Sequence, residues 1–336
     1  MANALILFIA CSAAPPVPMS TSLQAAPVPM STSLQAGEGT PAASPTIDVV
    51  YINADQSLDR RETQEHKREQ LASTPHGSVL RSYSRFPAVM CTCYDDATQP
   101  CELHAEVSAH TNATIEAAAN SPGGQWVRQV TPARTRARLT GATTSHATVL
   151  RDYAAAAADQ VAPYLLVLED DAVPTELLLR TLPALLAGAD DVTGPRGWHI
   201  LRLDTWGAVD EADRLGDRHV AGTNVSYFIS NRHSNRPPFY YYGSHATLVP
   251  KAHAARAARK MLDCAPAGSD SCGYMRVYRE GHPDLYNDRD FVPVIAWTGD
   301  PNRNESHLVT ISDEPSPTVP SPRGDYYSML GQFGLA

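Results

Sequence analysis

The chain has 336 residues, enough for one large domain or two small ones. Its hydrophobic fraction of 43% and charged fraction of 19% are ordinary for a globular protein. The formal net charge is -9 at pH 7, and the chain has no long run of lysine and arginine. This charge balance excludes the basic footprint of a nucleic-acid-binding protein, so we expect no nucleic-acid partner.

The first residues resemble a secretion signal. Residues 4–14 form an apolar run that ends in small residues before Pro15. A transmembrane helix needs about 20 apolar residues, so this run predicts a signal peptide over residues 1–14 and no transmembrane helix. Residues 1–3 carry no positive charge, which leaves an uncleaved anchor as the alternative. We therefore expect a protein of the secretory pathway, either secreted or kept in the Golgi or endoplasmic reticulum lumen.

Sequons and cysteines agree with that compartment. Three triplets have the form of N-glycosylation acceptors, and their asparagines are Asn112, Asn224 and Asn304. Short disulfide loops in an oxidising compartment suit two cysteine pairs, Cys93 with Cys101 and Cys264 with Cys272. The remaining Cys91 would be unpaired. A zinc site is the alternative, although the Cys91 and Cys93 pair has no matching Cys or His pair nearby.

Low-complexity sequence surrounds the expected domain. Residues 16–25 (PVPMSTSLQA) recur as residues 27–36, and Pro, Ser, Thr and Ala dominate up to residue 45. These segments lack the apolar periodicity needed for burial, so residues 15–45 are predicted to be a flexible linker. Residues 312–336 form a Pro/Ser-rich tail. The folded domain is therefore expected over residues 46–311.

Strand and helix patterns alternate within that domain. The β-branched run at 47–53 (IDVVYIN) indicates a buried strand, and the continuous apolar run at 164–168 (YLLVL) indicates a central strand of a parallel sheet. The other expected elements are helices over 55–71, 145–160, 176–187 and 251–262, and strands over 198–203 and 246–250. Such alternation predicts an open α/β sheet with helices on both faces. Ligands of these sheets bind at the carboxyl ends of the strands.

Three consecutive acids, Glu169, Asp170 and Asp171, end the apolar run at 164–168. Adjacent like charges repel one another and resist burial, and a divalent cation such as Mn²⁺ or Mg²⁺ relieves both effects. Because side chains alternate along a strand, Glu169 and Asp171 are expected to face one ligand together, with Asp170 pointing elsewhere. The alternative is a polar turn that opens the helix at 176–187.

The acidic cluster suggests a particular chemistry. A metal held there can bridge the two phosphates of a nucleotide sugar and neutralise the departing diphosphate. The acceptor hydroxyl would then need a base from elsewhere in the chain to take its proton.

Six short motifs follow one another in a familiar order: VYIN with DRR at 50–53 and 59–61, RFPAV at 85–89, GATTSH at 141–146, LEDDA at 168–172, YGSHATLV at 242–249 and PD at 283–284. Together they resemble glycosyltransferase family 25. That family includes bacterial lipooligosaccharide galactosyltransferases and animal collagen hydroxylysine galactosyltransferases. Ala142 stands where the family motif has cysteine, and Met90-Cys91 stand where it has Asp-Gly.

The resemblance implies a GT-A fold, which is a Rossmann-like nucleotide-binding sandwich with a mixed, mostly parallel sheet. It also implies Mn²⁺, a UDP-sugar donor such as UDP-galactose, and sugar transfer to a hydroxyl group of a glycan, glycoprotein or glycolipid. Direct displacement by that hydroxyl would invert the anomeric centre. The alternative is a secreted carbohydrate-binding or interaction protein that has the fold without turnover. A metal-dependent hydrolase is less consistent, because His199 and His219 are poorly spaced for a histidine-rich shell.

Site residues follow from the matched motifs. Metal and donor binding are expected of Glu169, Asp170, Asp171 and His245, and His245 has a purely structural role as its alternative. Asn53 is expected to bind the nucleoside or to form an ordinary strand-end turn. Arg60 and Arg61 are expected to pair with the diphosphate or to lie on a solvated helix.

The remaining roles belong to three more residues. Ser145 and His146 are expected near a helix start, where anions are favoured, with a helix N-cap as the alternative for Ser145. Asp284 is the expected catalytic base, and Asp288 and Asp290 are its rivals.

Overall fold

The computed structural model describes residues 45–89, 133–203, 214–220, 223–229, 244–263, 290–298 and 307–311. All of them belong to one compact unit, Ser44–Ala336. Several sequence predictions lie outside the described residues: the signal peptide, the repeat linker before residue 45, the C-terminal tail, all the cysteines, Asn112, Asn304, Asp284 and Asp288. They stay predictions.

The sheet is built around the two apolar runs that the sequence marks as strands. β1 (Ile47–Asn53) and β3 (Tyr164–Glu169) pair in parallel, and β2 (Leu80–Pro87) pairs in parallel with β1 on its other side. Six of the seven β1 residues are buried. Burial of successive residues means that both faces of the strand are covered, as the β-branched run predicts.

The sheet is mixed. Among the described residues its eight strands lie in the order β2, β1, β3, β8 (Ala246–Pro250), β5 (Ile200–Leu203), β9 (Pro293–Trp297), β7 (Ser226–Ile229) and β6 (Arg214–His219). β8 is antiparallel to β3 and β5, and β7 is antiparallel to β9 and β6. The other six strands therefore share one direction, which confirms a mixed, mostly parallel α/β sheet. β4 (Ala172–Pro174) and β10 (Val309–Ile311) form a separate antiparallel pair.

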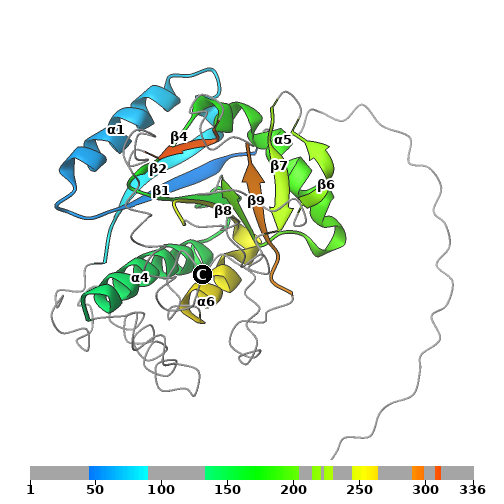
Figure 1. Ribbon diagram of the computed structural model, residues 1–336. Helices are drawn as coiled ribbons and strands as arrows, with labels where there is room; N and C mark the ends of the chain where they lie inside the picture. The colour runs from blue at the N-terminus through cyan, green and yellow to red at the C-terminus, as the bar shows by residue number, and fades with distance from the viewer. Residues whose placement is uncertain are drawn as a thin grey trace, which may run out of the picture. The chain divides into compact units, whose positions relative to one another are not determined.

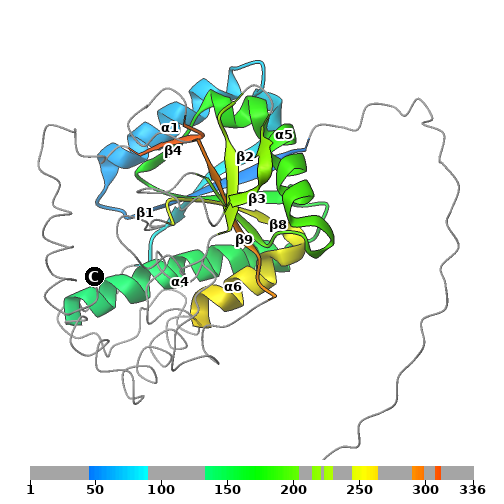
Figure 2. The ribbon, with the colours of Figure 1, turned by 45° about the vertical axis from the view of Figure 1, so that its right-hand side comes forward.

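Helices cover both faces of the sheet, as the sequence predicts. α1 (Leu58–Ala72) and α5 (Glu176–Thr193) lie above the sheet in Figure 1, and α4 (Ala133–Ala155) and α6 (Ala254–Asp263) lie below it; Figure 2 shows the same layers after a turn. Alternate residues of β3 point to opposite faces of the sheet and belong to two separate hydrophobic clusters. Leu166 and Leu168 pack with α5, whereas Leu165 and Val167 pack with α4 and α6.

The helix boundaries differ from the prediction for local reasons. α4 begins twelve residues before the expected Ser145, because the preceding segment ARTRARL consists largely of strong helix formers. α5 continues past residue 187 to Thr193 and contains Pro183, whose neighbours Leu182 and Leu185 are buried in the core. Short 3₁₀ turns are η1 (Gly77–Val79), η2 (Gly194–Arg196) and η4 (Lys251–His253), the last of which precedes α6.

Two further observations concern an acceptor asparagine and the apolar character of the helices. Asn224, the one acceptor asparagine within the described ranges, is exposed between β6 and β7, and its modification stays a prediction. In the part of the chain that the structure describes, no helix has the length and apolar character to span a membrane.

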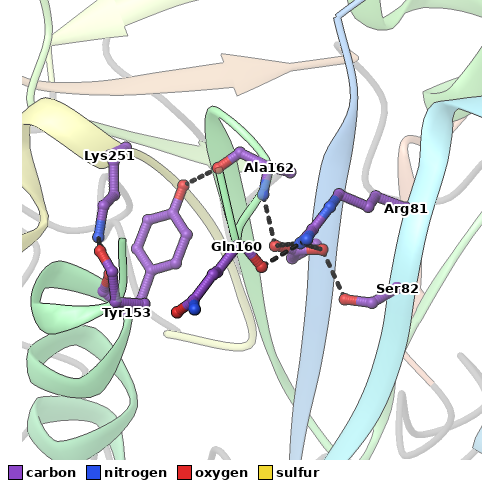
Figure 3. A network of polar contacts seen from close by, with 8 residues as sticks. Arg81, Ser82, Tyr153, Gln160, Ala162 and Lys251 are labelled. Atoms are coloured by element: carbon purple, nitrogen blue, oxygen red, sulfur yellow. Dashed lines mark hydrogen bonds and ion pairs between the residues drawn. The ribbon is translucent and has the colours of Figure 1, made fainter. Parts of the chain in front are cut away.

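A buried carboxylate joins three chain segments at the amino ends of the parallel strands. Asp48 of β1 accepts hydrogen bonds from the Ser82 hydroxyl at 2.6 Å and the Ala162 amide at 2.6 Å, and forms an ion pair with Arg81 at 3.0 Å. Figure 3 shows Arg81, Ser82 and Ala162 converging on this carboxylate. Its side chain is only 7% exposed, so these partners replace the water that the charge lost on folding.

Lys251 closes the end of α4 beside this network (Figure 3). Its ammonium group donates hydrogen bonds to the Ala156 carbonyl at 2.7 Å and to the Tyr153 carbonyl, and lies 4.9 Å from the Tyr153 ring centroid. A cation is favoured at a helix C-terminus, where the carbonyl groups lack partners within the helix. The Tyr153 hydroxyl donates to the Ala162 carbonyl at 2.7 Å, which joins α4 to the turn before β3.

We expect Asp48→Ala to lower the free energy of unfolding by about 3 kcal/mol. The substitution removes the carboxylate that binds the Ala162 amide, the Ser82 hydroxyl and the Arg81 guanidinium. Asp152→Ala is the control, since Asp152 is 54% exposed and pairs with its neighbour Arg151, and it should cost less than about 1 kcal/mol. Urea unfolding at pH 7 measures both. Equal effects of the two substitutions would contradict this account.

Candidate functional site

The acidic turn lies where three strands meet at one edge of the sheet. β1 ends at Asn53 and β3 ends at Glu169. The two strand ends lie side by side because the strands are parallel and Ile52 pairs with Glu169. β8 runs the other way, so its first residues lie at the same edge, and the Glu169 amide donates to the His245 carbonyl at 2.9 Å. The tertiary fold thus brings residues near positions 53, 169 and 245 together at the carboxyl edge, where open α/β sheets bind ligands.

Both carboxylate oxygens of Asp170 are engaged by protein donors. Asn53 Nδ2 donates to Oδ2 at 2.8 Å, and Arg60 Nη1 donates to Oδ1 at 2.7 Å. The Asp170 side chain is 13% exposed, so this ion pair lies largely out of solvent. Burial disfavours the charged form of Arg60, but the hydrogen bond and charge of Asp170, followed by the charge of Asp171, raise its pKa above the usual value.

Asn53 connects the acidic turn to β2. Its amide nitrogen also donates to the Ser57 carbonyl at 3.0 Å, and its amide oxygen accepts from Arg85 Nε at 3.0 Å. Arg85 of β2 donates in addition to the Asn53 carbonyl at 3.0 Å and pairs with Asp55. These bonds give Asn53 the role of a strand-end junction, and its expected contact with a nucleoside stays a prediction.

Glu169 is held in its charged form. Its Oε1 accepts a hydrogen bond from the Ser244 hydroxyl at 2.5 Å and lies 3.3 Å from Nε2 of the buried His146 on α4. Burial tends to raise the pKa of Glu169, but the hydrogen bond and charge of His146, the Ser244 hydroxyl and the charge of His245 outweigh it and lower the pKa to about 2. Glu169 is therefore ionised at neutral pH.

Asp171 has the opposite shift. Burial, and then the negative charges of Glu169 and Asp170, raise the pKa of Asp171 to about 6, although the charge of Arg60 opposes them. The pKa values of these two acids, which are separated by one residue, are thus shifted in opposite directions because the acids lie in different surroundings. The excess of negative charge around Asp171 favours an arriving cation.

The expected place of Ser145 and His146 near a helix start is wrong. Both lie well inside α4, which begins at Ala133, so Ser145 is neither a helix N-cap nor part of an anion site at a helix end. The Ser145 hydroxyl donates to the Gly141 carbonyl at 2.8 Å and accepts from the Val89 amide at 2.9 Å. Ser145 therefore ties the segment after β2 to α4, while His146 reaches the acidic turn through Glu169.

The structure also places two other residues with expected roles, Arg61 and Asp290. Arg61 is exposed on α1, and its charge acts on the phenol of Tyr51. Asp290 precedes β9, which runs in the same direction as β1 and β3, so it lies at the amino edge of the sheet. Asp290 is thus wrong as a rival catalytic base, because the acidic turn lies at the opposite edge.

The donor set suits a metal that brings its own ligands. Within the described ranges, no three His, Cys, Asp or Glu side chains are grouped closely enough to hold a metal ion. Besides Asp170, which pairs with Arg60 and Asn53, this edge carries Glu169, Asp171 and the buried His245. Mg²⁺ and similar ions are commonly bound by one or two carboxylates together with substrate phosphates and water. These residues fit that arrangement better than a closed protein cage.

Three residues of this network have no predicted role: Gln64, Arg85 and Ser244. Gln64 donates hydrogen bonds to the turn's backbone from α1, four residues after Arg60, and this spacing places both on one helix face. Arg85 lies opposite Tyr51 in the parallel pairing, and Ser244 immediately precedes His245. The helical spacing could have indicated Gln64, whereas the roles of the other two depend on strand register.

Comparison with known proteins adds little to the site. No family model matches this chain, and no curated protein does. A solved structure, described as a glycosyltransferase involved in the glycosylation of the major capsid of PBCV-1, is similar with a TM-score of 0.27 and 10% sequence identity. The match covers 64% of this chain and 64% of that chain, less than two thirds of its length. A likeness this low carries no functional argument, so the function must be inferred from the site.

We expect Asp171→Asn to stabilise the ligand-free protein at pH 8, by about 2 kcal/mol, and to have little effect at pH 4. The pKa of Asp171 is raised from 3.8 to about 6 in the folded protein. Its protonated form therefore contributes stability below about pH 4, and this contribution is lost as the pH rises through 6. Asparagine cannot ionise and avoids the loss.

Urea unfolding of wild type and Asp171→Asn at both pH values measures this difference. Asp152→Asn, which removes an exposed acid, controls for the change in net charge. A stability difference that does not change between pH 4 and pH 8 would refute the electrostatic explanation.

Proposed function

We propose that the protein is a glycosyltransferase that uses a nucleotide-sugar donor together with a divalent cation, Mn²⁺ or Mg²⁺. The observation that carries this proposal is the group of three consecutive acids, Glu169, Asp170 and Asp171, at the carboxyl edge of the sheet, where protein hydrogen bonds orient the carboxylates of Glu169 and Asp170. The raised pKa of Asp171 agrees with it. A cation bound to the phosphates of a donor would relieve that concentration of negative charge.

Each residue at this edge has a distinct task in the proposal. Asp171 and Glu169 would hold the cation through carboxylate oxygens, with His245 beside them. When bound, the cation would neutralise the charge that develops on the leaving diphosphate. Arg60, whose guanidinium lies on Asp170, supplies a fixed positive charge at the rim of the turn.

The surrounding hydrogen bonds orient these groups before any ligand arrives. Ser244 and His146 hold the carboxylate of Glu169, while Asn53 and Arg60 hold that of Asp170. Groups that are already oriented need no reorganisation when charge develops during the reaction, and this is a major source of catalytic power. This preorganisation supports a catalytic edge over a merely polar turn.

The finer assignments come from the motifs that resemble glycosyltransferase family 25. They favour UDP-galactose as the donor, inversion by direct displacement, and a hydroxyl of a glycan, glycoprotein or glycolipid as the acceptor. In this proposal Asp284 takes the proton from that hydroxyl, Asn53 and Arg61 assist donor binding, and the protein works in the secretory pathway or outside the cell.

Donor turnover by the purified full chain tests the proposal. We expect UDP release from UDP-galactose or a related UDP-sugar in the presence of Mn²⁺, and its loss on chelation. Asp171→Asn should lower the rate on the order of 100-fold, because it removes one charged group at the reaction centre. Since the same change is expected to stabilise the ligand-free protein, the loss cannot be attributed to unfolding. Asp152→Asn should keep the wild-type rate.

Two results would contradict the proposal. UDP binding in the presence of Mn²⁺ without turnover, across several donors and acceptors, would favour a carbohydrate-binding or interaction protein instead. Absence of both UDP binding and turnover would remove the nucleotide-sugar site altogether.

A further inference from the structure

Gln64 lies on α1 with its side chain 0% exposed. Its Nε2 donates hydrogen bonds to the Ala172 carbonyl at 2.7 Å and to the Asp170 carbonyl at 3.2 Å. Its Oε1 accepts from the Tyr83 hydroxyl at 2.6 Å. The amide thus links α1, β2 and the acidic turn between β3 and β4.

The chemistry of the partners determines which way this amide points. Carbonyl oxygens only accept hydrogen bonds, so the amide nitrogen must face Asp170 and Ala172. The amide oxygen then faces Tyr83, whose hydroxyl must be the donor. Burial raises the pKa of Tyr83, so the hydroxyl keeps its proton at every pH at which the protein would be studied. The orientation is therefore fixed from both ends.

The two carbonyls flank Asp171. β3 ends at Glu169 and β4 begins at Ala172, so one side chain bridges the whole turn between the strands. Arg60, one helical turn before Gln64, holds the Asp170 carboxylate from the same helix. α1 thus contacts the turn at two points. Gln64 binds the backbone of the turn, and Arg60 binds the Asp170 side chain.

A buried amide is favourable only when its donors and acceptor are satisfied. An apolar side chain of similar size would fill the same space between α1 and β2 without that cost. The presence of glutamine therefore points to a requirement on the turn's backbone. We propose that Gln64, oriented by Tyr83, is a positioning residue that fixes the backbone on both sides of Asp171. The effect of Gln64 on ligand binding at Asp171 rests on the proposed function, whereas its effect on the backbone does not.

Two substitutions test the proposal. Gln64→Met removes the amide itself, and Tyr83→Phe is the milder change. Methionine keeps the volume of glutamine but cannot bind the two carbonyls. Phenylalanine keeps the Tyr83 ring and removes only the hydroxyl that orients the amide, so this variant should fold even if Gln64→Met does not. Tyr153→Phe is the matched control, because it removes another buried tyrosine hydroxyl, which donates to the Ala162 carbonyl at the other end of the strands.

Hydrogen–deuterium exchange of the full-length protein reports on the turn without any ligand. Peptides that contain residues 169–173 should exchange about fivefold to tenfold faster in Gln64→Met and Tyr83→Phe than in wild type. Tyr153→Phe should leave these peptides at the wild-type rate. Unchanged exchange in Gln64→Met would overturn the proposal that Gln64 fixes the turn. If Gln64→Met does not fold, unchanged exchange in Tyr83→Phe would overturn it.

Affinity for UDP in the presence of Mn²⁺, measured by titration calorimetry, reports on the site. We expect the dissociation constant to rise about tenfold in Tyr83→Phe and Gln64→Met and to stay unchanged in Tyr153→Phe. Faster exchange with unchanged affinity would overturn the positioning role. If wild type itself binds no UDP, the proposed function fails, and the exchange experiment still decides whether Gln64 fixes the turn.

Discussion

The structure depends on how three consecutive carboxylates are accommodated at the end of a buried strand. Like charges this close cannot all be ionised without compensation, and each acid meets that constraint differently. Glu169 is charged because Ser244 and His146 bind it, whereas the Asp170 carboxylate accepts hydrogen bonds from Arg60 and Asn53. Asp171 remains the acid whose pKa is raised. The turn is therefore polarised before any ligand arrives.

This arrangement requires most of the fold. The partners of the acids come from β1, α1, α4 and the segment before β8, which lie on both faces of the sheet and on both sides of β3. At the other end of the same strands, the Asp48 carboxylate and the Lys251 ammonium join β1, β2, α4 and the turn before β3. A site that must hold charges at fixed positions needs such a rigid scaffold.

The polarised turn also implies a tension between stability and function. An acid held beside two other acids destabilises the folded protein when it loses its proton. A cation with its phosphate ligands would relieve this strain, so the feature that weakens the ligand-free protein would strengthen its complex. Gln64 fits the same logic, because its hydrogen bonds to the Asp170 and Ala172 carbonyls are proposed to fix the backbone on both sides of Asp171.

The sequence by itself determined the strands at β1, β3 and β8, the layered α/β class and the position of the acidic turn, because apolar runs and charge clusters are local patterns that burial acts on directly. It did not determine β2 or β6, whose mixed polar residues carry no clear strand pattern. It also misplaced Ser145, because the arginine-rich residues 133–139 belong to the same helix. The pairing of Asn53 with Asp170, of Ser244 with Glu169 and of Gln64 with the turn was decided only by the tertiary structure, since strand register and helix packing bring together residues that lie up to 117 positions apart.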